Sequence, residues 1–410
     1  MMTIDKEWVK NEIETIASWG QGSRGVTRLA FTETAIRAED YMIGLMEEAG
    51  LTVTRDQIGN IIGRLAGKDN SLPAVVTGSH LDTVPEGGKF DGVLGVVGGL
   101  AAIHRLKDKG QLTHPVELIV FVCEESSRFG FATIGSKVMT GLANLSAWNK
   151  ANDQNGLSFS EVMSQYNHDM GEFNNAARSV EEIKTFIELH IEQGRILEKA
   201  GNTIGVVEAI AAPTRLKLIV EGVAAHSGAT PMEERQDALV SASMIVLAIQ
   251  EIALEQSRYG TVATVGALKV HPGSINVIPG IVEMLVDIRG VEQESIIECL
   301  QEIKDAVSTI AEEQETVVSI SMISADKPVK MDKTVTSLIK KVCVEKGVPH
   351  QFIHSRAGHD AMNMSRLAPT GMIFVPSKGG ISHNPEEDTD YNDIMIGIDV
   401  LTETLYQFAK

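Results

Sequence analysis

The fold is decided at residues 74–103, which read AVVTGSHLDTVPEGGKFDGVLGVVGGLAAI. The stretch opens with apolar and β-branched residues that predict a buried strand, and it closes with an apolar helical pattern that continues to residue 107. Short apolar runs at residues 117–123, 185–189 and 371–375 predict further strands. Strands that are apolar throughout are typical of a sheet covered by helices on both faces, so we predict an α/β domain.

A different pattern occupies residues 215–321. It reads as a strand, a long helix, two strands, a second helix and a final strand, and this βαββαβ order is typical of a compact two-layer unit. Because the strand at 371–375 comes later in the chain, the unit is predicted to be an insertion. The predicted domains are therefore an α/β domain at residues 1–208 and 325–410 and an inserted domain at residues 209–324.

The composition is that of a folded, acidic chain. The 410 residues are 43% hydrophobic and 22% charged, which permits sizeable cores and excludes wholesale disorder. With 36 basic and 55 acidic residues the net charge is −19, so we expect neither nucleic acid nor a membrane surface as a partner. Three cysteines without a C-x-x-C pair predict neither a disulfide framework nor a thiolate zinc site.

The chain shows no signal for export or membrane insertion. The N-terminal residues alternate charged and apolar side chains, unlike a signal peptide. The longest apolar stretch, residues 93–103, is well short of the ~20 residues that a membrane-spanning helix needs. We therefore expect a cytoplasmic location and no transmembrane segment.

Histidines and carboxylates follow four of the predicted strands. Functional groups in open α/β sheets gather just beyond the carboxyl ends of strands, so these side chains should meet at one edge. A set of imidazoles and carboxylates with no basic cluster nearby in sequence favours divalent metal, and its size favours a dinuclear site. The set is His80, Asp82, Asp91, Glu124, Glu125, His190 and His383.

Spacing suggests a division of roles within this set. Asp82 lies two residues after His80, so its carboxylate is expected to accept the proton of the imidazole nitrogen that does not bind metal. Glu124 and Glu125 are adjacent at a strand end and should point in different directions. One could then bind metal while the other accepts a proton.

Two common catalytic signatures are excluded. The segment GQGSRG at residues 20–25 matches the dinucleotide pattern, but a helical segment precedes it where a strand is required. No G-x-S-x-G elbow for a serine nucleophile occurs. Six of the 11 histidines are interpreted as structural or solvated: His104, His114, His168, His271, His350 and His354.

Seven segments together point to a family. In chain order they are GSHLDTVPEGGKFDG (78–92), EESSRF (124–129), ELHIEQG (188–194), HSGATPMEERQD (226–237), GSINVIPG (273–280), AGHDA (357–361) and GISHNPEE (380–387). This run resembles the hydantoinase/carbamoylase branch of the dinuclear-metal aminoacylase and carboxypeptidase superfamily, over nearly the whole chain. The resemblance implies a mixed-sheet metallopeptidase-like catalytic domain with an inserted βαββαβ lid and dimerisation domain.

The resemblance also implies roles for individual residues. It places two divalent ions (zinc, manganese, cobalt or nickel) on two ligand sets that share Asp91 as a bridge, and it makes Glu124 the general base. One set is His80, Asp91 and His190, and the other is Asp91, Glu125 and His383. The implied substrate contacts are Gln193, His226, Asn276, Arg289, Gly358 and His359.

The implied activity is hydrolysis of the ureido group of an N-carbamoyl-L-amino acid to the amino acid, ammonia and carbon dioxide. Arg289 would pair with the substrate carboxylate, and His226 would stabilise the oxyanion. The resemblance further implies a homodimer in which His226 acts on the site of the neighbouring subunit. Small and apolar residues at 131–141 and 209–214 favour this substrate over allantoate, whose second ureido arm needs more hydrogen-bond partners. Ser126 departs from the pattern, because many relatives carry glycine there.

Three alternatives stay open. The substrate could be that of an allantoate amidohydrolase or a β-ureidopropionase. The bond cleaved could instead be an ordinary amide, as in a dipeptidase or aminoacylase of the same fold. A metal-binding module without catalysis is disfavoured, because Glu124 stands as a free base beside a full set of ligands.

Overall fold

The computed structural model describes residues 4–410, and these form two compact units. The first comprises the described residues up to Glu208 together with Met331–Ile353 and His359–Lys410. The second comprises Ala209–Lys330 and His354–Gly358. The first boundary falls where the sequence analysis placed it, and the second lies six residues later than the predicted 324. The reason is β15 (Val329–Lys330), which pairs with Ile210 and Ala209 of β8 (Ile204–Ile210).

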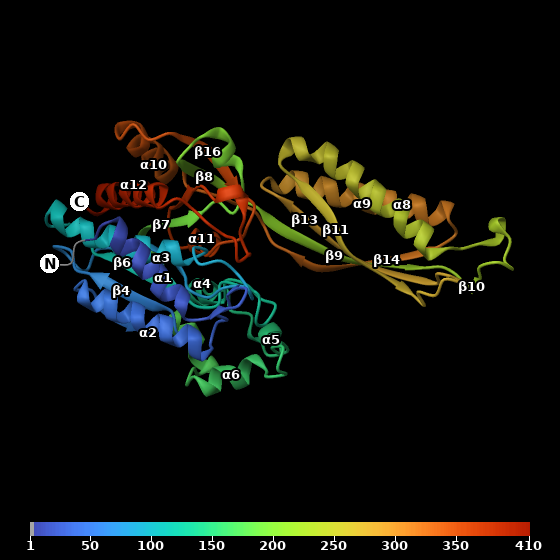
Figure 1. Ribbon diagram of the computed structural model, residues 1–410, viewed down its shortest axis with the longest axis horizontal. Helices are drawn as coiled ribbons and strands as arrows, with labels where there is room; N and C mark the ends of the chain where they lie inside the picture. Colours follow the sequence, from blue (N-terminus) through green and yellow to red (C-terminus); the bar gives the residue numbers. More distant parts are fainter. Residues whose placement is uncertain (1–3) are drawn as a thin grey trace. The chain divides into compact units, whose positions relative to one another are not determined.

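The core of the first unit is a mixed sheet (Figure 1). Its order is β8-β17-β7-β5-β6-β4-β3, with β16 (His350–Ser355) paired to β8, and β15 extends the sheet by pairing with the last two residues of β8, which belong to the second unit. The four central strands run parallel, and β4 and β3 continue the sheet in antiparallel pairing. These strands are β3 (Thr52–Arg55), β4 (Ile61–Leu65), β5 (Ala74–His80), β6 (Val116–Phe121), β7 (Ile183–Ile191) and β17 (Thr370–Val375). The predicted α/β class is confirmed.

Burial explains why these strands read as continuous apolar runs. Every residue of β5, β6 and β17 is buried, because helices pack onto the sheet. The main helices are α1 (Lys6–Ser18), α2 (Glu33–Glu48), α3 (Val93–Leu106), α10 (Lys333–Glu345) and α12 (Tyr391–Ala409). Helix α3 has twelve buried residues, and nine of them belong to the largest apolar cluster.

Shorter elements complete the first unit. The segment GQGSRG forms the hairpin of β1 (Gln21–Gly22) and β2 (Gly25–Val26) after helix α1, which is no setting for a dinucleotide. The short helices are α4 (Ile134–Met139), α5 (Leu145–Trp148), α6 (Phe159–Gln165), α7 (Ile196–Ala200) and α11 (Ala361–Met364).

The second unit has the predicted βαββαβ order. Its antiparallel sheet is ordered β11-β13-β9-β14, and the two long helices share one apolar cluster with it. A separate strand pair joins β10 (Ala225–His226) to β12 (Val277–Ile278). The main elements are β9 (Ala212–Glu221), α8 (Ala238–Gln256), β11 (Val262–His271), β13 (Ile281–Gly290), α9 (Gln293–Glu313) and β14 (Val317–Ala325).

Helix α8 is more apolar than a surface helix needs to be. With the following turn, Ala238–Tyr259, it is long and apolar enough by length and composition to cross a membrane, with a mean hydropathy of 1.7. The expectation of no such segment rested on the longest uninterrupted apolar run, residues 93–103, which is too short to span a membrane. One face of α8 packs onto the antiparallel sheet, as a core helix does, while Val240, Leu247 and Leu254 on the helix are exposed.

Candidate metal centre

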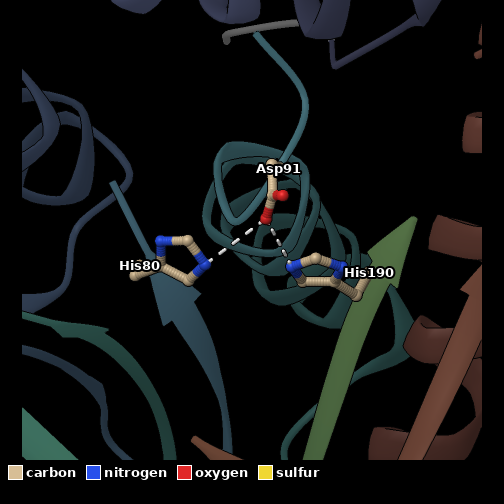
Figure 2. A group of neighbouring side chains, drawn as sticks. All are labelled: His80, Asp91 and His190. Carbon is tan, nitrogen blue, oxygen red and sulfur yellow. Dashed lines mark ion pairs between the residues drawn. The ribbon is translucent and has the colours of Figure 1, made fainter. Parts of the chain in front are cut away.

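The parallel strands bring the predicted ligands together. His80 is the last residue of β5, His190 lies near the end of β7, and Glu124 and Glu125 follow β6. Because these strands are neighbours in the sheet, their carboxyl ends meet at one edge. Asp91 reaches the same place from the turn before α3, and Figure 2 shows it between the two imidazoles.

Asp91 is the centre of the arrangement, and its two oxygens face different partners. Oδ1 lies 3.2 Å from His190 Nε2 and 3.6 Å from His80 Nε2. Oδ2 lies 3.2 Å from His383 Nε2, and that nitrogen is 3.1 Å from Glu125 Oε1. Asp91 thus belongs to two triads, one with His80 and His190 and one with Glu125 and His383. Within each triad the possible ligand atoms lie within 4.8 Å of one another, close enough to share a metal ion. The geometry is therefore that of a carboxylate able to bridge two ions.

The imidazoles are oriented as metal ligands require. His80 Nδ1 lies 2.9 Å from the carbonyl oxygen of Asp82, and His190 Nδ1 lies 2.9 Å from that of Ile191. A carbonyl only accepts hydrogen bonds, so each Nδ1 carries the proton and each Nε2 presents a lone pair toward Asp91. Gly92 supports this assignment, since its N–H donates to His190 Nε2 over 3.1 Å. The residues present fit a divalent metal.

The predicted role of the Asp82 carboxylate is corrected by these contacts. The backbone carbonyl of Asp82, not its carboxylate, accepts the His80 proton, and the nearest carboxylate oxygen is 3.7 Å away. The carboxylate instead accepts the backbone N–H groups of Glu124, over 3.2 Å, and Glu125, over 3.0 Å. The side chain of Asp82 thus holds the turn that carries the two glutamates.

The two glutamates point to different partners. Glu125 faces His383, whereas Glu124 Oε2 lies 3.8 Å from His80 Nε2. Burial raises the pKa of Glu124 well above its ordinary value, and the charge of Glu125 adds to this against the opposing effect of His80. A buried carboxyl with a raised pKa can take a proton and return it, which is the chemistry of a general base.

Electrostatics make this edge of the sheet attractive to cations. Burial alone would raise the pKa of Asp91, but the neighbouring imidazoles of His190, His383 and His80 hold it well below its usual range. Burial alone would lower the pKa of His80, yet Asp91, Glu124 and Asp82 raise it well above its ordinary value. Buried carboxylates outnumber the cations that neutralise them, so a divalent ion can replace protons here.

Three residues at this edge of the sheet have a left-handed backbone conformation. The φ angles are +54° at Cys123, just before Glu124, +58° at Gln193 and +54° at His383. Residues other than glycine adopt this conformation at a cost, and such residues gather at functional sites. At Gly92, with φ +67°, an added Cβ would lie 2.5 Å from the His80 ring, so glycine is required there.

Of the predicted substrate contacts, Gln193 and His359 lie beside the ligands in the first unit. Gln193 Nε2 donates to Asp91 Oδ2 over 2.7 Å, and its Oε1 is buried without a hydrogen-bond partner among the described residues. The ring of His359 packs edge-on against His190, with centroids 4.6 Å apart. Burial, reinforced by the charge on His190, holds the pKa of His359 well below its ordinary value.

The other predicted substrate contacts belong to the second unit. His226 and Asn276 lie side by side, because β10 pairs with β12 and Ser227 N–H donates to Asn276 O over 3.1 Å. His226 Nδ1 accepts N–H groups from Gly228 and Ala229 over 3.0 and 3.2 Å, so the proton of the neutral ring sits on Nε2. That exposed N–H is a donor of the kind an oxyanion needs.

The guanidinium of Arg289, predicted to pair with a substrate carboxylate, already has partners within the second unit. Its Nε and Nη2 both lie 3.1 Å from Asp287 Oδ2, and Nη1 donates to the carbonyl of Arg356 over 3.1 Å. A substrate carboxylate would have to use the hydrogens that these contacts leave. Gly358 lies in the same unit, two residues after Arg356.

Sequence reasoning missed a layer of buried polar residues behind the ligands. Glu387 accepts the backbone N–H groups of Phe90 and Asp91, and Glu188 accepts Ser79 Oγ and the N–H of Ala361. Glu188, His190 and His359 also form a compact triad whose ligand atoms lie close enough to hold an ion, and each oxygen of Glu188 accepts one of these hydrogen bonds. Glu387 stood inside the quoted segment GISHNPEE, four residues after His383, which was the only available signal.

Known proteins are similar to this chain in sequence and in fold. The family model described as peptidase family M20/M25/M40 matches residues 76–407. A Geobacillus stearothermophilus protein named N-carbamoyl-L-amino acid amidohydrolase is 40% identical, with 95% of each chain covered. An Arabidopsis thaliana ureidoglycolate hydrolase is 37% identical over 100% of this chain and 87% of its own. The crystal structure of a hydantoinase/carbamoylase family amidase from Burkholderia multivorans is similar with a TM-score of 0.91 and 36% identity, covering 99% and 98% of the two chains.

Proposed function

The chain belongs to peptidase family M20/M25/M40, and we propose that its substrate is an N-carbamoyl-L-amino acid. It is a hydrolase of C–N amide bonds, related to the carbamoylases and allantoate amidohydrolases. The products would be the amino acid, ammonia and carbon dioxide. The observation that carries the proposal is the position of Asp91, whose two oxygens face two separate ligand triads beside the buried carboxyl of Glu124.

The metal requirement follows from the two triads. His80, Asp91 and His190 would hold one divalent ion, and Asp91 would share a second with Glu125 and His383. Zinc, manganese, cobalt and nickel all suit imidazole and carboxylate ligands. When bound, such ions polarise a carbonyl and lower the pKa of water toward neutrality.

The protein's own residues would move the proton. Glu124 accepts a proton from the attacking water and later delivers it to the nitrogen of the leaving amino acid. The C–N bond then breaks, and the carbonyl group forms again on the carbamate. The raised pKa of Glu124 suits a group that must hold this proton between the two steps. Carbamate formed in this way decomposes to ammonia and carbon dioxide.

Residues of the inserted unit would recognise the substrate. We assign the oxyanion to the exposed Nε2–H of His226, supported by the two backbone N–H groups that fix its tautomer. Arg289 would pair with the substrate carboxylate, with Asn276, Gly358, Gln193 and His359 as further contacts. These assignments rest on the family resemblance.

A substrate panel tests the proposal. Ammonia release would be measured from N-carbamoyl-L-methionine, allantoate, ureidoglycolate and β-ureidopropionate, and release of free amino acid from a dipeptide, with the metal-loaded protein. The highest kcat/KM is expected for N-carbamoyl-L-methionine. A clear preference for allantoate or ureidoglycolate would overturn the substrate while leaving the metal centre intact, and a preference for the dipeptide would move the activity to an ordinary amide. The relative named ureidoglycolate hydrolase makes ureidoglycolate the strongest rival.

We further propose that the chain is a homodimer that associates through the inserted unit. Val240, Leu247 and Leu254 lie seven residues apart on α8, with exposed fractions of 46%, 61% and 66%. A heptad-spaced apolar stripe of this kind suits a second copy of the same helix. Light scattering should give twice the chain mass, and Leu247→Glu should reduce it to one, whereas a wild-type monomer would refute the assignment.

A cytoplasmic location is also part of the proposal. It is supported by the three cysteines, all of which are buried free thiols in the described structure. Fractionation of cells that express the tagged protein tests it, and recovery in a secreted fraction would exclude it.

A further inference from the structure

Glu387 joins two segments that lie far apart in the chain. Its side chain is only 4% exposed, and its Oε1 accepts the N–H groups of Phe90, over 2.9 Å, and Asp91, over 3.1 Å. These partners are 297 and 296 residues away in sequence. The backbone that carries the central carboxylate of the metal centre is therefore anchored to a loop near the C-terminus.

The surrounding backbone is shaped around this carboxylate. At Gly88 an added Cβ would lie 2.1 Å from Glu387 Oε1, so only glycine leaves room for it. The turn at residues 88–91 thus wraps one oxygen of Glu387 with two N–H donors and a position that has no side chain. Such a cradle holds a carboxylate in one orientation.

The second oxygen of Glu387 engages the loop that carries His383. Ser382 Oγ lies 2.8 Å from Glu387 Oε2 and 3.1 Å from Asp91 Oδ2. A serine hydroxyl has one hydrogen, so it donates to one of these oxygens and stands in contact with the other. Ser382 thereby connects Glu387 to the very oxygen of Asp91 that faces His383.

This connection matters because His383 is the least enclosed of the ligands. Its side chain is 49% exposed, whereas those of His80 and His190 are 2% and 1% exposed. Packing fixes the buried imidazoles, but it cannot fix a half-exposed one. The position of His383 then depends on its own loop, and Glu387 ties that loop to Asp91.

We propose that Glu387 is a positioning residue that fixes Asp91 and the His383 loop relative to each other, so that the metal affinity of the triad Asp91, Glu125 and His383 depends on this connection. Glu387 is not assigned as a ligand, because its Oε1 accepts two backbone N–H groups and it belongs to neither ligand triad. The proposal rests on the metal centre of the proposed function and is independent of the substrate.

Metal affinity, measured without substrate, tests the role. Purified Glu387→Ala, Glu387→Gln and Ser382→Ala would be freed of metal and titrated with Zn²⁺ or Co²⁺ against a chromophoric chelator. Glu386→Ala is the matched control, because Glu386 is the neighbouring residue, carries the same charge and has an exposed side chain. We expect Glu387→Ala to weaken the second equivalent of metal by about 10–100-fold, the usual effect of losing a partner behind a ligand. Glu386→Ala should bind like the parent.

The conservative variants separate positioning from simple stability. Glu387→Gln keeps one oxygen for the two N–H groups and offers its NH₂ to Ser382 Oγ, so it should lose less affinity than Glu387→Ala. Thermal unfolding of the metal-free proteins reports the structural contribution by itself. If Glu387→Ala lowers the melting temperature but binds both equivalents like the parent, the proposal is overturned.

Two further outcomes are decisive. Should Glu387→Ala fail to fold, the same titration of Glu387→Gln and Ser382→Ala decides: weakened second-site binding supports the role, and parental binding in both overturns it. A parent that binds two metal ions but hydrolyses no member of the substrate panel would refute the proposed substrates and leave the inference about Glu387 standing.

Discussion

The substitution Asp82→Asn distinguishes two roles for one buried carboxylate. In the structure its oxygens accept the N–H groups of Glu124 and Glu125, while its backbone carbonyl holds His80. Asparagine keeps one acceptor oxygen and turns an NH₂ group toward the other N–H. One hydrogen bond is lost, and a buried donor is left without an acceptor.

The expected cost follows from those contacts. Leaving a buried donor unpaired costs about 1–3 kcal/mol. If this cost falls on the placement of Glu124 in the transition state, kcat should fall roughly 5- to 150-fold at about 1.4 kcal/mol per tenfold. Metal affinity should stay within about threefold of the parent, because the substitution leaves the carbonyl that orients His80 in place.

Two measurements check this expectation. Ammonia release at saturating metal gives kcat, and a chelator-competition titration gives metal affinity. Glu117→Gln is the control, since Glu117 is a buried carboxylate on β6 that pairs with Arg64 and Arg178, away from the metal ligands. It should lower thermal stability without changing either measurement. If Asp82→Asn instead loses metal 10–100-fold and keeps the parental kcat once loaded, the carboxylate orients His80 and our reasoning is refuted.

Four further predictions follow from the same site. Glu124→Gln should retain metal but lose at least about 100-fold in kcat, because an amide cannot accept the proton; near-parental activity in the metal-loaded variant would remove Glu124 as the base. Mixing His226→Ala with Glu124→Gln should restore part of the activity if His226 acts across the dimer, and confirmed subunit exchange without recovery would place it elsewhere. Arg289→Ala should cost on the order of 2–5 kcal/mol in kcat/KM for an N-carbamoyl-L-amino acid, and an unchanged value would exclude Arg289 as the carboxylate partner. Asp91 and Glu125 raise the pKa of His383 from 6.5 to about 10, so in the metal-free protein its protonation stabilises the fold below pH 6.5, and this contribution is lost as the pH rises through 10. Metal needs the neutral imidazole, so metal affinity titrated between pH 6 and 9 should increase with pH and binding should release protons; a pH-independent affinity would contradict this.

Much of the fold could be predicted because its strands and helices carry local signals. The fully buried strands β5, β6 and β17 read as apolar runs, and the order of strands and helices at 215–321 predicted the two-layer unit. The end of the inserted unit was misplaced by six residues, because β15 is only two residues long and exists through its pairing with β8. A strand that short has no periodicity to read.

The same contrast holds at the metal centre. Sequence by itself predicted that imidazoles and carboxylates gather at one edge, because polar residues directly follow the apolar strand runs. The order of the sheet then places His80, Glu125 and His190 after neighbouring parallel strands. The sequence could not decide which group of Asp82 meets His80, because a carbonyl and a carboxylate on one residue are equally near in sequence. Nor could it connect Glu387 to Asp91, which lies 296 residues away. Hydrogen bonds of this kind depend on distances of a few tenths of an ångström between segments that only the folded chain brings together, and the pattern of residue types carries no trace of them.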